Sequence, residues 1–185
     1  MTALSSARDT QPERERILAA ARRTIEAGTP LSMRKLAADL GVAHTAIYWH
    51  IGGRDELIDA VVDGFIADLG EIRPRGRTSR QRMASIAREV HRQAVEHRAL
   101  VSLALERGRF AALWAPARRA LTAEVEAAGL SGRDATRVVT TILYLAGAFV
   151  TLEAALEEHA DQTPAGVSRK VFADALDAVL DRIGG

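Results

Sequence analysis

The stretch of sequence that decides the fold runs from Ser32 to Ile51 and reads SMRKLAADLGVAHTAIYWHI. Ser32 is a favourable N-cap, and Leu36 and Leu40 fall one turn apart on the same helical face. Gly41 can adopt the positive φ that ends a helix, and a second helix can start within three residues of it. The spacing therefore predicts two short helices joined by a tight turn.

Two short helices set at a steep angle are typical of a helix-turn-helix that reads DNA. In such a unit the second helix lies in the major groove with its first residues nearest the base edges, and the first helix crosses the phosphate backbone. The pattern predicts base contacts for His44 and Thr45, and phosphate contacts for Arg34 and Lys35. The alternative is an ordinary corner between two helices, in which these residues have no DNA to contact.

The residues around and after the turn favour the DNA-reading interpretation. Residues 47–51 read IYWHI and are followed by GGRDEL; an RKLA run at residues 34–37 and an LGV turn at residues 40–42 precede them. From about residue 13 to residue 66 the chain resembles the TetR family of bacterial repressors, and the Tyr-Trp-His segment is most similar to the tetracycline-repressor branch. The resemblance implies a homodimeric, ligand-responsive transcriptional repressor.

The resemblance also implies roles for the aromatic residues of the second helix. Tyr48 and His50 are expected to contact phosphates and Trp49 to pack inward, whereas the alternative is that all three fill a small core. The Gly52-Gly53 pair departs from the polar, lysine-bearing turn that is usual in the family, which leaves Arg54 as the main phosphate candidate there. The predicted DNA-contacting residues are Met33, Arg34, Lys35, His44, Thr45, Ala46, Tyr48, His50 and Arg54.

Composition restricts the class of protein. The 185 residues are 48% hydrophobic and 26% charged, which is typical of a globular protein with a substantial core. The absence of cysteine excludes disulfides, thiolate nucleophiles and cysteine-based zinc sites. Residues 1–11 are polar, unlike a signal peptide, and the longest uncharged run, residues 138–152, is shorter than the ~20 residues of a membrane span. We expect a cytoplasmic protein without membrane attachment.

Net charge by itself does not indicate DNA binding, because acidic residues outnumber basic residues over residues 1–70. The segment from Ser32 to Arg54, however, carries three basic residues and only Asp39 as an acid. Phosphate affinity depends on the local placement of charge. We therefore expect a small number of phosphate contacts and a modest salt dependence.

Helix start and stop signals divide the N-terminal part of the chain. Residues 1–10 are expected to be a mobile arm. A first helix is expected to begin at a capping box formed by Thr10 and Glu13 and to stop at Gly28. This helix supports the two that follow it.

The remaining sequence predicts an all-α fold, with neither a strand pattern nor a repeat. Residues 54–70 predict a connecting helix that ends before the break at residues 72–77. We expect a three-helix helix-turn-helix DNA-binding domain at residues 1–53. It is joined to a helical ligand-binding and dimerisation bundle at residues 54–185.

Caps and glycines predict the helices of the C-terminal bundle. Pro116 suits a first helical turn, Gly129 a helix end, and Thr163 with Pro164 another helix start. Arginines are frequent from residue 73 to residue 98, which favours a solvated linker and outer helical face over a second nucleic-acid surface. The expected helices are residues 79–97, 99–107, 116–129, 134–159 and 164–183, the fourth with a capping box at Ser131 and Asp134.

The long helix at residues 134–159 carries two adjacent apolar stripes, so it must be buried on more than one side. One side is expected to contact its own core and the other a second subunit. Together with the helix at residues 164–183, it predicts an isologous four-helix interface in a homodimer, as the resemblance implies. A two-fold dimer reads a palindromic operator in double-stranded DNA.

A repressor of this family also needs a pocket for a small-molecule inducer. We expect it between the helix at residues 79–97, the short segment at residues 110–114 and the long helix. Trp114 and Tyr144 are the strongest candidates, because a buried aromatic residue with a polar edge either finds a partner or contacts a ligand. The full set of lining candidates is Met83, His91, Leu103, Phe110, Trp114, Thr140, Thr141, Tyr144 and Phe149, with a plain core position as the alternative for each.

No metal, cofactor or catalytic group is expected. His91 and His97 are six residues apart, which is not the spacing of metal ligands on one helical face. Tetracycline repressors carry a magnesium-binding histidine where this chain has SLALERG at residues 102–108, so the resemblance implies a mainly apolar inducer instead of a metal–tetracycline complex. The chain has no nucleophile–base motif or paired-carboxylate motif of an enzyme. The alternatives to a repressor are a helical ligand-binding protein and a non-specific DNA-binding protein.

Overall fold

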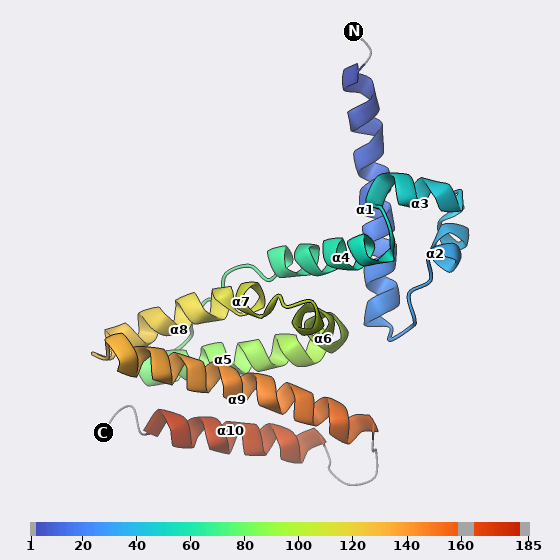
Figure 1. Cartoon of the computed structure of the whole chain (residues 1–185). Helices are drawn as coiled ribbons and strands as arrows, with labels where there is room; N and C mark the ends of the chain where they lie inside the picture. Colours follow the sequence, from blue (N-terminus) through green and yellow to red (C-terminus); the bar gives the residue numbers. More distant parts are fainter. Residues whose placement is uncertain (1–2, 159–164, 182–185) are drawn as a thin grey trace. The chain divides into compact units, whose positions relative to one another are not determined.

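The computed structural model describes residues 3–158 and 165–181, with side chains at residues 13–152 and 169–181. The described residues form helices without a strand, so the predicted all-α fold is confirmed (Figure 1). The helices are α1 (Ala3–Glu26), α2 (Met33–Leu40), α3 (His44–Ile51), α4 (Arg54–Asp68), α5 (Ser79–Glu96), α6 (Arg98–Glu106), α7 (Phe110–Leu113), α8 (Ala115–Ala127), α9 (Gly132–Glu158) and α10 (Ala165–Asp181).

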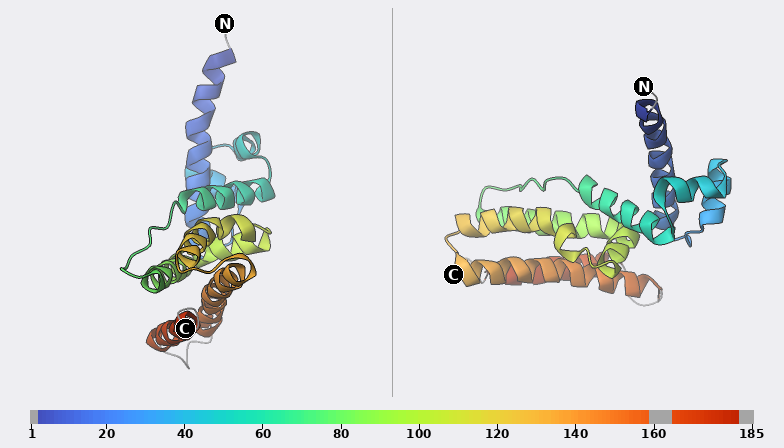
Figure 2. Two further views of the ribbon diagram at one scale, coloured as in Figure 1. Left: turned by 90° about the vertical axis from the view of Figure 1, so that its left-hand side faces the viewer. Right: turned by 45° about the horizontal axis from the view of Figure 1, so that its top comes forward.

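The helices fall into two compact units. The first unit contains Met1–Asp68 together with Ala99–Arg109, and the second contains Leu69–Arg98 together with Phe110–Gly185. Helix α6 therefore groups with α1–α4, although it lies between α5 and α7 in the sequence. Within the second unit, α5, α8 and α9 pack against one another and α10 packs on α9 and α5 (Figure 2).

Helix α1 is longer than the sequence signals predict. It begins at Ala3, so the expectation of an arm over residues 1–10 and of a helix start at Thr10 was wrong. A capping box marks a helix start only where the preceding residues cannot continue the helix, and residues 3–9 contain neither glycine nor proline. The C-terminal end of α1 agrees better with the predicted stop at Gly28, since α1 ends at Glu26 and Gly28 adopts a φ of 65°.

The turn between α2 and α3 forms as predicted. The Oγ of Ser32 accepts a hydrogen bond from the backbone N–H of Lys35 at 3.4 Å. Gly41 has a φ of 69°, and its N–H donates to carbonyls of the last turn of α2. Ile17 of α1, Leu36 and Ile47 are buried together in the core of this unit. The caps at Ser32 and Gly41 therefore fix the two ends of α2, and the buried core holds α2 and α3 against α1.

The second unit is stabilised by a cap that the sequence analysis missed. Thr78 and Gln81 form a capping box at the start of α5, with the backbone N–H of Gln81 donating to Thr78 Oγ1. Pro116 lies in the first turn of α8, and Gly129 has a φ of 88°, as predicted. Helix α9 begins at Gly132, directly after Ser131, which agrees with the predicted position of its N-cap, and the Asp134 carboxylate pairs with Arg137 at 2.9 Å.

Two arginines of α5 form ion pairs between helices. Arg80 pairs with Asp177 and Asp181 of α10, and Arg82 pairs with Glu124 of α8 at 2.7 Å. Both arginines are partly exposed, as a solvated helical face requires, but their ion pairs were not predicted, because a one-dimensional pattern cannot show acids brought close by other helices. Arg80 and Arg82 hold α5 against its neighbours.

Helix α9 is strongly apolar, although the other helices of its unit bury only part of its surface. The stretch Gly132–Leu152 is long and apolar enough to cross a membrane by length and composition, but only 33% of its most apolar window is buried. One such helix is weak evidence for a membrane protein, because apolar core helices meet the same criteria. The predicted helix start at Thr163-Pro164 and the predicted helix ends at residues 159 and 183 lie outside the described residues.

Candidate functional site

Helix α3 presents an exposed face formed by His44, Thr45, Tyr48 and Trp49. Successive helical residues are ~100° apart, so the fully buried Ile47 anchors the helix on one side and directs these four side chains away from the core. The rings of His44 and Tyr48 lie edge to face with their centroids 5.0 Å apart. We call these four residues the α3 face.

Trp49 was predicted to pack inward, and the structure contradicts this expectation. Its side chain is 71% exposed, more than the 47% of Tyr48. Trp49 lies two residues after Ile47 and is therefore turned by ~200° from the buried side of α3. The alternative of an aromatic core is also wrong, and the burial of Ile47 was the sequence signal that could have placed Trp49 outside.

His50 and Ala46, both predicted to contact DNA, are half-buried at the edge of the α3 face. The His50 ring lies against the ring of Trp49, with centroids 4.9 Å apart and an interplanar angle of 79°. His50 therefore supports the orientation of Trp49.

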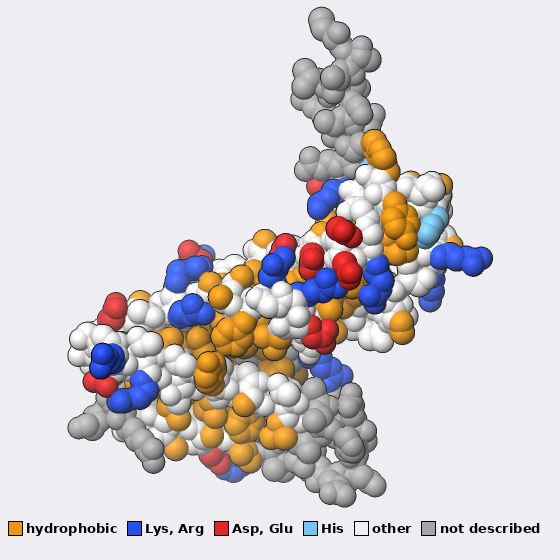
Figure 3. All heavy atoms as spheres, viewed as in Figure 1, with side chains coloured by type: hydrophobic (Ala, Val, Ile, Leu, Met, Phe, Trp, Pro, Cys, Tyr) orange, Lys and Arg blue, Asp and Glu red, His pale blue; other side chains and the backbone are white. Residues whose placement is uncertain are grey.

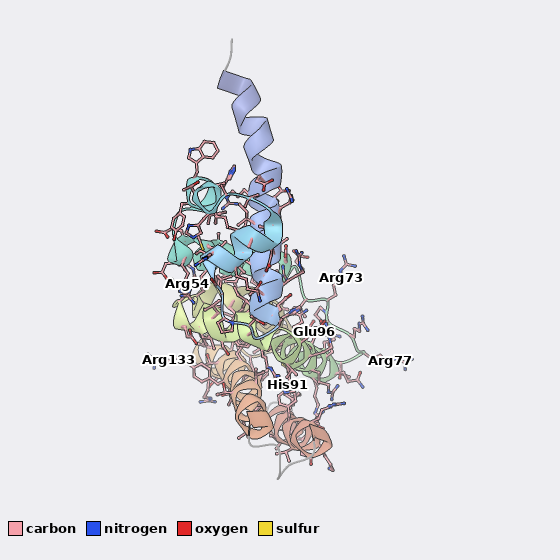
Figure 4. The ribbon with its side chains drawn as sticks, turned by 90° about the vertical axis from the view of Figure 1, so that its right-hand side faces the viewer. Arg54, Arg73, Arg77, His91, Glu96 and Arg133 are labelled. Carbon is pink, nitrogen blue, oxygen red and sulfur yellow. The ribbon has the colours of Figure 1, made fainter. Side chains whose placement is uncertain are left out.

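The basic residues of α2 lie on the surface of the same unit. Arg34 and Lys35 are exposed, whereas Met33 is buried in the core, so the Met33 side chain is not on the predicted interface. Arg54 is exposed at the start of α4, and its Nε donates to the carbonyl of Leu31 at 3.3 Å (Figure 4). That bond holds Arg54 beside the N-terminus of α2.

The surface that results combines two kinds of side chain. Exposed hydrophobic side chains, a histidine and basic side chains lie near one another at the α2–α3 end of the first unit (Figure 3). Basic side chains attract phosphates, while aromatic and hydroxyl side chains at the start of a helix can contact base edges. The arrangement has the composition of a nucleic-acid interface.

Residues 17–61 match the model of the bacterial regulatory proteins, tetR family. The helix-turn-helix domain belongs to the tetR family. The resemblance predicted from the sequence is therefore confirmed, and the TetR-family match spans α2, α3 and the part of α1 and α4 that packs against them. TetR-family proteins are DNA-binding regulators. No curated protein matches the chain.

Solved structures share the fold over nearly the whole chain. Apo ActR from Streptomyces coelicolor is 20% identical, with 92% of this chain and 94% of ActR covered and a TM-score of 0.66. A TetR variant from Acinetobacter baumannii AYE in complex with minocycline is 18% identical, with 91% and 96% covered and a TM-score of 0.65. A protein of unknown function from Rhodococcus sp. RHA1 is 25% identical, with 93% and 95% covered and a TM-score of 0.68. The fold of this chain is thus the fold of TetR-family regulators.

The predicted ligand-contacting residues separate into two aromatic clusters in the second unit. In the first, Phe110 of α7 lies 6.1 Å from Trp114 and 6.2 Å from Tyr144 of α9, measured between ring centroids. Trp114 is 5% exposed, whereas Phe110 and Tyr144 are 41% and 62% exposed. This cluster therefore combines a buried ring with two rings that are open to solvent.

In the second cluster, His91 of α5 stacks on Phe172 of α10 with a centroid distance of 4.3 Å and an interplanar angle of 14°. Phe149 of α9 lies edge to face with Phe172 at 5.4 Å. His91 and Phe172 are buried. The contact of Phe172 with His91 follows from the packing of α10 on α5.

The other predicted ligand-contacting residues do not join either ring cluster. Met83 is buried in α5, Thr140 is half-buried, and the exposed Thr141 donates its hydroxyl to the carbonyl of Arg137 at 2.8 Å. Leu103 lies on α6 in the first unit. Within the described residues, no group of three His, Cys, Asp or Glu side chains is arranged to hold a metal ion.

Helices α4 and α6 of the first unit are joined by ion pairs. Asp55, Asp59 and Asp63 of α4 recur every fourth residue; Arg107 pairs with the first two at 2.7 Å and 3.5 Å, and Arg109 pairs with Asp63 at 3.0 Å. A hydrogen bond and Coulomb attraction from Arg107 hold the pKa of the Asp55 carboxyl below its usual value. We call these contacts the α4–α6 ion pairs.

Proposed function

We propose that the chain is a transcriptional repressor that binds a palindromic operator as a homodimer and is released by a small, mainly apolar inducer. The observation that carries the proposal is the exposed α3 face in a domain that matches the tetR family. A globular protein gains nothing in stability from placing Trp49 and Tyr48 in water, and a DNA groove would cover them. We expect a cytoplasmic protein that needs no cofactor.

In the proposed complex α3 enters the major groove. His44 and Thr45, at the first turn, contact base edges, and Tyr48 and Trp49 contact the sugar–phosphate wall beside them. The exposed Arg34 and Lys35 of α2, and Arg54 at the start of α4, neutralise phosphates. His50 and Ala46 act at the edge of the interface. His50 orients Trp49, and Ala46 sets the distance between α3 and the groove.

The dimer is supported by one row of residues on α9. Val138, Thr141, Leu145, Ala148 and Leu152 follow at alternating steps of three and four residues, which is the spacing of a seam between helices. Thr141, Ala148 and Leu152 are exposed, and Val138 and Leu145 are half-buried. We call this row the α9 seam and propose that it pairs with the same helix of a second copy, flanked by α10, where Val171 is 49% exposed.

Release by an inducer requires a path from the ligand to α3. Helix α6 is tied to α4 by the α4–α6 ion pairs, while the segments before and after α6 belong to the second unit. A ligand that binds better to a state with a displaced α6 would shift the population away from the DNA-binding spacing of the two α3 helices. ActR has been solved in complex with actinorhodin and a TetR variant with minocycline, which supports a ligand-responsive role for this fold.

The experiment is a fluorescence anisotropy titration of the full chain with labelled duplex from upstream of its own gene and with a scrambled duplex of equal composition. We expect ~10³-fold or greater preference for the upstream duplex. Thr45→Ala and Tyr48→Ala should reduce that preference, and sedimentation velocity should show that both variants remain dimeric. As a control, Thr136→Ala changes an exposed residue of α9 in the second unit and should leave the preference unchanged.

The alternatives give different results in the same titration. A non-specific DNA-binding protein would bind both duplexes equally, and a helical ligand-binding protein would bind neither. Full operator affinity in both the Thr45 and Tyr48 variants would overturn the assignment of α3 as the reading helix.

A further inference from the structure

The indole of Trp114 carries a hydrogen-bond donor that its surroundings do not satisfy. Trp114 lies at the start of α8 and is 5% exposed. Its Nε1 is buried and has no hydrogen-bond partner in the part of the chain that the structure describes. Buried N–H groups are usually paired, because an unpaired donor loses its hydrogen bond to water without replacement. Such an exception points to an acceptor that the chain itself does not supply.

The six-membered ring of the indole lies beside α9 at Gly147. A Cβ placed on Gly147 would lie 3.7 Å from Cζ2 of Trp114. Cζ2 is bonded to Cε2, the ring carbon that also carries Nε1, so Gly147 lies near the part of the indole that carries the donor, while Nε1 itself is more than 4 Å from that Cβ. Tyr144 precedes Gly147 by three residues and therefore shares its helical face.

Steric packing does not explain why residue 147 is glycine. A distance of 3.7 Å is ordinary van der Waals contact, so alanine would fit against Trp114 without displacing it. Glycine inside a helix is less favourable than alanine by ~1 kcal/mol. The missing methyl group leaves room beside Cζ2 of the indole, at a cost to the stability of α9.

The space is bordered by rings that are open to solvent. Phe110 and Tyr144 lie at an angle to one another with centroids 6.2 Å apart, and both are substantially exposed. Exposed aromatic faces beside a buried donor suit a flat apolar molecule that also accepts one hydrogen bond. We call Phe110, Trp114, Tyr144 and Gly147 the Trp114 cluster.

We propose that the Trp114 cluster binds a planar aromatic ligand through its rings and through one oxygen that accepts the hydrogen bond of Trp114 Nε1. The inference rests on the proposed function, since it assigns the position and chemical class of the inducer. Because the rings of Phe110 and Tyr144 are inclined at 62°, one of them contacts the ligand plane by its face and the other by its edge, and Gly147 leaves room for the rim of the ligand. A carbonyl or ether oxygen satisfies the indole without requiring a charged group.

A pair of probes of equal shape tests the hydrogen bond. 9-Fluorenone and fluorene are flat tricyclic molecules that differ in having a carbonyl or a methylene at one position. Equilibrium dialysis against the full chain should show ~5-fold to 10-fold tighter binding of fluorenone, the effect of one net hydrogen bond. Trp114→Phe keeps a ring at the site and should make the two affinities equal. Equal affinities for the unmodified chain, or a preference retained in Trp114→Phe, would overturn the proposal.

The indole resonances give a second readout. A ¹⁵N–¹H spectrum contains one indole peak from each of Trp49 and Trp114, and Trp114→Phe identifies the latter. Fluorenone should shift the Trp114 peak while the Trp49 peak stays in place, and fluorene should not produce the shift of a newly formed hydrogen bond. A Trp114 peak that moves with protein concentration and ignores both probes would show that a second copy of the chain supplies the acceptor, and would contradict the proposal.

The glycine provides a test that does not remove the donor. Gly147→Ala should weaken both probes by ~10-fold or more while raising the midpoint of thermal unfolding. Gly64→Ala in α4 is the matched control, because Gly64 has no atom within 4 Å of an added Cβ and lies outside the Trp114 cluster. Unchanged probe binding in Gly147→Ala would overturn the proposal.

Operator binding separates this inference from the proposed function. If neither probe binds while the unmodified chain still prefers its upstream duplex, only the ligand assignment fails. If the probes bind as expected but the operator preference is absent, the ligand site stands and the repressor function fails.

Discussion

At the scale of single residues, Gly41 and Ile47 determine how α3 is presented. Gly41 ends α2 with a φ of 69°, a conformation that costs other residues roughly 1–2 kcal/mol. Ile47 is fully buried and fixes the rotation of α3, so that the α3 face points to solvent. One residue thus sets the direction of the chain and the other sets which side chains are exposed.

The role of Gly41 predicts opposite effects for two similar substitutions. Gly41→Ala should lower the free energy of unfolding by about 1 kcal/mol, because alanine is strained at positive φ although nothing lies within 4 Å of its Cβ. Gly64→Ala, in the interior of α4 and equally unobstructed, should raise it by about 0.5–1 kcal/mol. Urea denaturation measures both, and equal signs would contradict the assignment of strain to Gly41.

A second pair of substitutions separates packing from DNA contact within α3. Ile47→Ala should lower the free energy of unfolding by about 2–4 kcal/mol, because it leaves a cavity in a small core. Trp49→Ala removes a side chain that is 71% exposed and should change stability by less than about 0.5 kcal/mol while weakening operator binding at least several-fold. Denaturation and anisotropy titration are measured on the same samples. Strong destabilisation by Trp49→Ala would restore the inward packing that the resemblance implied.

At the scale of elements, ion pairs join the C-terminal end of α6 to α4. Arg107 and Arg109 reach three aspartates that are one helical turn apart on α4. The cations also lie at the C-terminal end of α6, where they interact favourably with the helix dipole. These contacts respond to pH, which apolar contacts would not.

The Asp55 carboxyl provides the titration that tests the α4–α6 ion pairs. Because the pKa of Asp55 is lower in the folded chain than its usual value of about 3.9, its contribution to stability is present above that value and is lost as the pH falls through the folded pKa. A ¹³C carboxyl titration should give Asp55 a midpoint below the usual value, and Arg107→Gln should return it toward that value.

A second carboxyl serves as the internal control for this titration. The pKa of Glu89 in α5 is also lowered, mainly by its hydrogen bond with Arg92, and should not respond to Arg107→Gln. An unchanged Asp55 midpoint in Arg107→Gln would mean that the ion pair does not form in solution.

At the scale of the whole molecule, the apolar surface left uncovered on α9 supports the proposed homodimer. Only 33% of the most apolar window of α9 is buried, and Tyr144, Ala148 and Leu152 are exposed apolar residues of this helix. Two copies related by a two-fold axis cover the same row on each subunit at once. Hydrophobic side chains gather over the second unit on the face that carries α9 (Figure 3).

The proposed dimer predicts a linked loss of assembly and DNA binding. Leu145→Asp places a charge in the middle of the α9 seam and should give a monomer in sedimentation velocity, with operator affinity reduced by at least 100-fold because each half-site is then bound alone. Leu105→Asp changes another leucine, 40% exposed on α6, and should leave the dimer intact. A Leu145→Asp protein that remains dimeric would place the interface elsewhere.

Local signals in the sequence determined the helices and the turn at Gly41, because caps, glycines and apolar spacing act over three to five residues and need no distant partner. The resemblance of residues 13–66 likewise identified the DNA-binding domain, since its motif is contiguous in the chain. Tertiary packing alone decided that Arg80 and Arg82 pair with other helices and that α6 joins the first unit. It also left the indole of Trp114 unsatisfied beside Gly147. These features depend on which distant side chains come within a few ångströms, and no local pattern carries that information.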